Sequence, residues 1–101
     1  MKYVLRPVAR TDLGDIWSHT AERWGVSQAD DYVAAIISRL EDAANFPQLG
    51  SPIHSLGKNY RKLAAGHHRL IYRYTDDKLT VVRILHERQD ALDISDFDEP
   101  Q

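Results

Sequence analysis

The sequence predicts an α+β domain in which an antiparallel pair of helices lies against one face of a mainly antiparallel sheet. Three observations lead to this fold class: a short β-like run near the start, two long stretches with apolar residues at helical spacing, and three strand-like segments in a row. The chain has 101 residues, which is enough for one domain with a small core.

The first strand is expected at residues 2–6, and Pro7 closes it because proline has no N–H to continue a ladder. The first helix is expected from residue 9 to residue 24, where apolar residues recur every three or four positions. Thr11 or Asp12 is placed to cap its start, and Gly25 stops it.

The second helix is expected to open at Ser27, whose hydroxyl can cap it, and to end before Pro47. Its apolar stripe is broad enough to contact both a helix and a sheet. Because only about two residues separate the helices, we expect them to fold back as a hairpin. The stripe comprises Ala29, Tyr32, Val33, Ile36, Ile37, Leu40, Ala43 and Ala44.

Residues 47–59 have the composition of a loop, with two prolines and two glycines. Three strands are then expected as a meander at residues 60–65, 67–75 and 78–87, separated by Gly66 and by Asp76-Asp77. Both sheet faces are partly apolar. Alternation puts Leu70, Tyr72 and Tyr74 on one face of the middle strand, and Leu79, Val81, Arg83 and Leu85 on one face of the last. The position of the first strand in the sheet stays open.

The net charge of -2 conceals an uneven distribution. Residues 1–55 carry five Lys/Arg against seven Asp/Glu, residues 56–88 carry eight against three, and residues 89–101 carry none against five. The three segments thus carry -2, +5 and -5, so a basic block precedes an acidic tail. The chain has no cysteine, no apolar run near the ~18 residues of a membrane span and no secretory signal, and we expect a cytoplasmic protein.

Several kinds of chemistry are excluded by pattern. His67 and His68 are adjacent on a predicted strand and should point to opposite faces, so no metal site and no cofactor are expected. The serines show no nucleophile elbow, and Gly50 and Gly57 do not belong to a phosphate-binding loop.

A basic set remains on and beyond the predicted meander: Arg61, Lys62, Arg69, Arg73, Arg83, His86 and Arg88. In a metal-independent nuclease such a set would stabilise the phosphate while histidine transfers protons. On a binding surface it would neutralise the charges of an acidic partner. It is equally compatible with ion pairs to the acidic helices and with a structural His86, so the residues alone leave the choice open.

The order of elements and several short motifs resemble the ParE toxins of the RelE/ParE superfamily. The motifs are Ile16-Trp17, Trp24-Gly25, NFPQLG at 45–50, YRKL at 60–63, GHHRLIYR at 66–73 and VRILHERQD at 82–90. The resemblance covers residues 2 to 90, which implies a toxin domain at residues 1–90 and an acidic C-terminal tail at residues 91–101.

The resemblance implies the toxin of a bacterial type II toxin–antitoxin system, as in plasmid stabilisation, neutralised by a ParD-like antitoxin in a hetero-oligomer. ParE toxins inhibit DNA gyrase, for which we expect a surface of Arg83, His86 and Arg88. The alternative is a ribosome-dependent mRNA endonuclease of the RelE type, with Arg61, Arg69, His86 and Arg88 as catalytic candidates.

The catalytic set expected of such a nuclease is incomplete here. Leu63 replaces a lysine of the RelE pattern, Glu87 follows His86, and no tyrosine occurs beyond Tyr74. A non-enzymatic gyrase inhibitor is therefore the preferred interpretation, with no direct nucleic-acid or membrane contact. A stand-alone nucleic-acid-binding domain is a third alternative, which the acidic tail disfavours. Candidates for antitoxin contact are Trp17, Tyr32, Leu56, Tyr60 and Arg73.

Overall fold

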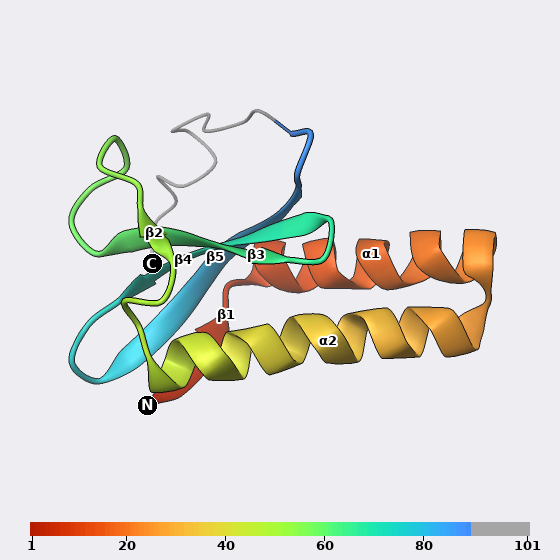
Figure 1. Ribbon diagram of the computed structural model, residues 1–101, viewed down its shortest axis with the longest axis horizontal. Helices are drawn as coiled ribbons and strands as arrows, with labels where there is room; N and C mark the ends of the chain where they lie inside the picture. The colour runs from red at the N-terminus through yellow and green to blue at the C-terminus, as the bar shows by residue number, and fades with distance from the viewer. Residues whose placement is uncertain (90–101) are drawn as a thin grey trace.

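The computed structural model describes residues 1–89, so the predicted acidic tail at 91–101 lies outside the described residues. Two helices pack on one face of a five-stranded sheet of order β1-β5-β4-β3-β2 (Figure 1). In residues 1–89 no helix is long and apolar enough to cross a membrane. The elements are β1 (Lys2–Leu5), α1 (Pro7–Trp24), α2 (Val26–Asn45), β2 (Ser51–Pro52), β3 (Tyr60–Ala65), β4 (His68–Tyr74) and β5 (Lys78–His86).

The predicted α+β class and the three-stranded meander are confirmed. β3, β4 and β5 pair antiparallel in sequence order, as short turns require. β1 pairs in parallel with β5, from Lys2 opposite Lys78 to Leu5 opposite Val81. A parallel pair needs a long crossover connection, and the helical hairpin provides it, so the last strand of the meander lies inside the sheet.

Both helices begin earlier than predicted and the N-cap assignments are wrong, whereas Gly25 ends α1 as predicted. α1 starts at Pro7, because proline is favourable at the first helical position, where no N–H is needed. The Thr11 hydroxyl donates to the Pro7 carbonyl (3.2 Å), and Asp12 contacts β5. α2 starts one residue before Ser27, directly after Gly25, which takes a positive φ of 96° and reverses the chain.

The sheet has a buried layer on each side, as its two partly apolar faces predict. The layer under the helices is centred on fully buried Ile36 and Leu40 of α2 with Leu70, Tyr72 and Leu79 of the sheet. On the opposite face a smaller cluster forms beneath the segment that precedes β3. That cluster contains Ile53, Ile71, Val82 and Leu85, with Leu56 and Tyr60 packed against it.

The strict alternation predicted for the last strand is wrong beyond Val82. Tyr72 pairs with Val81 and Ile71 with Arg83, so Val82 is an extra residue on β5. Such a bulge shifts the alternation of side chains by one position. Ile84 consequently faces the helices and Leu85 packs in the opposite cluster, the reverse of the expectation. Arg83 pairs with Ile71, and its guanidinium contacts Asp12 of α1.

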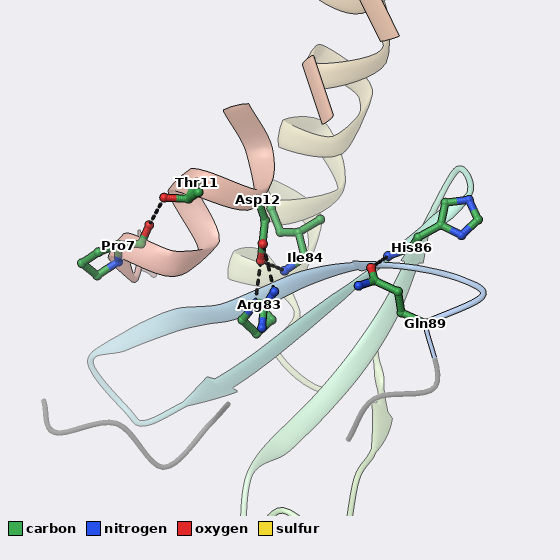
Figure 2. A network of polar contacts seen from close by, with 7 residues as sticks. All are labelled: Pro7, Thr11, Asp12, Arg83, Ile84, His86 and Gln89. Atoms are coloured by element: carbon green, nitrogen blue, oxygen red, sulfur yellow. Dashed lines mark hydrogen bonds and ion pairs between the residues drawn. The ribbon is translucent and has the colours of Figure 1, made fainter. Parts of the chain in front are cut away.

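The carboxylate of Asp12 in α1 holds the bulged part of β5 (Figure 2). Its Oδ2 accepts hydrogen bonds from Nε of Arg83 (2.8 Å) and from the backbone N–H of Ile84 (2.9 Å), and Oδ1 accepts one from Nη2 of Arg83 (3.0 Å). β1 ends opposite Val81 of β5, so the Ile84 N–H lies beyond the end of β1 and donates to Asp12 instead of to a strand carbonyl. The two side chains are only 13% (Asp12) and 17% (Arg83) exposed.

The loop after α2 is anchored by one buried phenol and one guanidinium. The Tyr72 hydroxyl donates to the Pro47 carbonyl (2.7 Å) and accepts the Gly50 N–H (2.9 Å). Arg61 donates to the carbonyls of Gly50 and Gln48. Burial raises the pKa of Tyr72, so the phenol stays protonated and can donate. The segment predicted as a plain loop thus includes β2, which pairs with β3.

Replacing Asp12 with alanine is expected to lower the free energy of unfolding by about 2–3 kcal/mol. It removes a partly buried ion pair and the acceptor of the Ile84 amide together. Urea denaturation followed by circular dichroism measures the loss. Asp15→Ala on the same helix is the matched control, because Asp15 is exposed. An unchanged midpoint for Asp12→Ala would contradict this role.

Two glycine-to-alanine substitutions should act in opposite directions. At Gly50 a Cβ would lie 2.6 Å from the Lys62 carbonyl oxygen and 2.8 Å from the Tyr72 hydroxyl, so Gly50→Ala must displace the anchored loop. At Gly14, inside α1, a Cβ meets nothing within 4 Å. Gly14→Ala should therefore stabilise the protein by up to about 1 kcal/mol. Thermal unfolding of the two variants tests the opposite signs.

Candidate functional site

A cavity of about 820 Å³ opens where the helical hairpin passes the end of the sheet. Figure 1 shows the connection between α1 and α2 projecting beyond the strands. The cavity is bordered by the second half of α1, the first half of α2, the β3–β4 turn and the end of β5. It is lined by Asp15, Ile16, His19, Thr20, Arg23, Trp24, Gln28, Tyr32, His67, His68 and His86.

Tyr32 of α2 organises the β3–β4 turn at this cavity. Its hydroxyl accepts the backbone N–H of His67 (3.0 Å) and lies 2.6 Å from Nδ1 of His68. The turn fits closely, since a Cβ at Gly66, which has a φ of 59°, would lie 2.8 Å from the Tyr32 oxygen. His67 belongs to the turn and not to β4, so the expectation that it points away from His68 is wrong: both line the cavity.

His86 lies beside His68 because the two residues pair across β4 and β5. Their rings meet edge to face with centroids 5.2 Å apart. Nδ1 of His86 accepts the backbone N–H of Arg88 (3.1 Å), which turns the chain after β5. Nδ1 of His67 lies 2.9 Å from Oε2 of Glu87. One end of the sheet thus carries a connected group of three imidazoles, a phenol and a carboxylate.

The electrostatics of this group favour a neutral His68. Burial lowers the pKa of His68, and the neighbouring His86 and His67 lower it further. The hydrogen bond from His67 lowers the pKa of Glu87, which keeps that carboxylate ionised. Within residues 1–89 no cluster of three or more His, Cys, Asp or Glu side chains has the geometry to hold a metal ion. The arrangement can hydrogen-bond a ligand or exchange a proton with it.

The structure does not bring the four nuclease candidates together. Arg61 is hydrogen-bonded to loop carbonyls and pairs with Tyr72, four positions along β4 from His68. Arg69 is exposed and follows His68 on β4, so it points to the face opposite the helices. His86 and exposed Arg88 lie near each other at the end of β5.

The antitoxin candidates fall into two groups on opposite sides of the sheet. Trp17 and Tyr32 are on the helices, where Nε1 of Trp17 donates to Asp30 (2.9 Å) and Tyr32 contacts the β3–β4 turn. Leu56 and Tyr60 pack against the cluster on the other face, and half-buried Arg73 pairs with Tyr60 across β3 and β4. Among the gyrase candidates, Arg83 forms an ion pair with Asp12, whereas Arg88 is exposed.

Sequence reasoning missed three residues that shape this region. Asp12 contacts β5 and does not cap α1, and Trp24, the last residue of α1, is 70% exposed. His19 was not singled out at all. The available signal was the unusual number of histidines: four of the chain's five line one cavity.

Comparison with known proteins confirms the resemblance to ParE. The chain matches the family described as "ParE toxin of type II toxin-antitoxin system, parDE" over residues 3–91. It is 41% identical to Toxin ParE1 of Mycobacterium tuberculosis over 91 residues, covering 89% of this chain and 93% of that protein. It is 37% identical to Toxin ParE1 of Caulobacter vibrioides over 89 residues, covering 88% and 92%.

Solved structures agree in fold. A chain of the chromosomal ParDE toxin–antitoxin system from P. aeruginosa superposes with a TM-score of 0.73 at 19% identity. The match covers 85% of this chain and 95% of that one. A chain of the RelBE2 toxin–antitoxin complex from Mycobacterium tuberculosis gives 0.62 at 20% identity, with coverages of 84% and 95%. With the family match over residues 3–91, the conclusion is that this chain belongs to the ParE toxin family of type II toxin–antitoxin systems.

Proposed function

We propose that this ParE toxin is neutralised by a ParD-like antitoxin and acts by binding DNA gyrase, without a catalytic step of its own. The observation that carries the proposal is the dispersal of the basic residues that a RelE-type nuclease would assemble. Arg61 is committed to the loop after α2, and Arg69 lies on the face opposite the His68–His86 pair.

Phosphodiester cleavage needs positive charge around the phosphate and a proton donor beside it. Next to His86 this chain places Glu87, which stays ionised and hydrogen-bonded to His67. This carboxylate stands where a RelE-type nuclease would need a proton donor. The chain also has no tyrosine after Tyr74 that could supply a phenol. The end of β5 therefore suits protein recognition better than nucleic-acid cleavage.

For the gyrase surface we propose His86 and Arg88 as contact residues. Arg83 would support this surface indirectly, by holding β5 in place. Arg88 is exposed, and its backbone N–H is held by His86, so its position relative to the sheet is defined. Arg83 is hydrogen-bonded through two of its nitrogens to Asp12. Its contribution is to fix the bulged end of β5 against α1.

An antitoxin partner is supported by apolar side chains exposed on a rigid part of the surface. Phe46 is 69% exposed and Leu49 is 45% exposed, although Tyr72 and Arg61 anchor the loop between them. Two exposed apolar side chains on one anchored loop are suited to a protein contact, in which they would be buried. The similar solved structures come from a ParDE system and a RelBE2 toxin–antitoxin complex. We propose that the antitoxin covers this loop as well as the predicted contact residues on either side of the sheet.

Reversing the charge of Arg88 should weaken inhibition of purified gyrase. We expect Arg88→Glu to need about tenfold more toxin than wild type in a supercoiling assay, because loss of a charged contact costs about 1.4 kcal/mol or more. Arg10→Glu, an exposed reversal near the start of α1, is the matched control and should behave as wild type. Equal inhibition by Arg88→Glu and wild type would remove Arg88 from the contact surface.

The same preparations should be incubated with translating ribosomes. The proposal predicts intact messages and inhibited gyrase. Cleavage of ribosome-bound mRNA, with gyrase unaffected, would instead establish the nuclease alternative.

The double substitution Phe46→Ser with Leu49→Ser should weaken antitoxin binding while leaving the fold intact. Both side chains are exposed in the free toxin, so thermal unfolding should change little. Burial of the two side chains in a complex predicts at least about a tenfold loss of affinity by calorimetry. Gln48→Ala, an exposed change between them, is the control. Wild-type affinity of the double variant would place the antitoxin elsewhere.

A further inference from the structure

We propose that the cavity at the end of the sheet binds a small phosphorylated aromatic compound of mononucleotide size. The site shares His86 with the proposed gyrase surface and Tyr32 with the predicted antitoxin contacts, but ligand binding does not depend on either function. The hydrogen-bond donors, the charge and the aromatic surface that line the cavity support the proposal.

The hydrogen-bond partners are consistent with one arrangement of the hydrogens on the two histidines. The Tyr32 oxygen accepts the His67 N–H, and in the arrangement that we propose its own hydrogen is donated to Nδ1 of His68. Nδ1 of His86 accepts the Arg88 N–H. In a neutral imidazole whose Nδ1 is an acceptor, Nε2 carries the hydrogen. His68 and His86 therefore each present an Nε2–H donor in one cavity, with ring centroids 5.2 Å apart.

Two neighbouring imidazole donors are suited to an oxyanion. Arg23 supplies a permanent positive charge at the same cavity, and His19 and His67 add further donors. The negative groups are Asp15, which lines the cavity, and Glu87, whose carboxylate is hydrogen-bonded to His67. A phosphate monoester offers three acceptor oxygens to this set.

The remaining surface of the cavity is suited to an aromatic ring. Trp24 is 70% exposed at the end of α1, and Ile16 and Tyr32 form the apolar wall on the helices. An exposed indole beside phosphate donors offers a stacking surface, as in single-strand nucleotide binding. The volume of about 820 Å³ lies within the range of small-molecule sites.

Binding should strengthen as the pH falls. The groups that face His68 are Tyr32 on α2, His67 and Glu87 beside the β3–β4 turn, His86 on β5 and Asp12 on α1. In the free protein, burial and the two neighbouring histidines disfavour a charged His68. A bound phosphate reverses this preference, so complex formation takes up a proton, and affinity rises from about pH 8 to about pH 6.

The test is a titration of the full chain with adenosine 5′-monophosphate, inorganic phosphate and adenosine, followed by NMR of the imidazole nitrogens. We expect the monophosphate to shift the His68 and His86 signals, to bind about tenfold more tightly than either phosphate or adenosine alone, and to bind more tightly at about pH 6 than at about pH 8. His86→Gln and Arg23→Gln should each weaken the monophosphate about tenfold.

Two further variants separate the parts of the site. Trp24→Ala, an exposed change that should not affect folding, is expected to remove the advantage of the monophosphate over phosphate and to leave phosphate binding unchanged. His54→Gln is the control, because His54 is an exposed histidine outside the cavity. The proposal is overturned if the monophosphate leaves the His68 and His86 signals unmoved, if adenosine binds as tightly as the monophosphate, or if His54→Gln weakens binding as much as His86→Gln.

Discussion

The contact of Asp12 with β5 is the interaction on which the rest of this molecule depends. It joins the first helix to the strand at the point where β1 ends and where Val82 interrupts the alternation of side chains. Without the one-residue shift, Ile84 would leave the helix-side core and Leu85 would leave the opposite cluster. The Asp12 carboxylate holds both the side chain of Arg83 and the amide of Ile84, so it stabilises the strand in the shifted register.

The functional end of the chain follows from this register and from the way the hairpin passes the sheet. His86 lies beyond the bulge on the helix side, where its ring contacts His68, which in turn contacts Tyr32. The α1–α2 connection projects beyond the strands (Figure 1), and the cavity lies where the hairpin passes the end of the sheet. Arg61 lies at the anchored loop, away from His68 and His86. The positive charges that a nuclease would need in one place are therefore separated.

The strands and the helical hairpin could be predicted from sequence because their signals are local. Gly66 and Asp76-Asp77 punctuate the meander, and the apolar stripe of α2 identifies its buried face. The bulge could not be predicted, because alternation carries no mark of an extra residue until a partner strand defines the register. The grouping of His19 with His67, His68 and His86 could not be predicted either, since it depends on where the hairpin ends relative to the sheet.

The proposed action of this toxin is contact with DNA gyrase, and direct binding to gyrase tests this most simply. Calorimetric titration of the purified chain into purified DNA gyrase, without nucleic acid, should give saturable binding of defined stoichiometry. The chain should leave ribosome-bound mRNA uncut at the same concentrations. Absence of any heat of binding to gyrase, together with cleavage of translated messages, would contradict the account and assign the chain a catalytic mechanism.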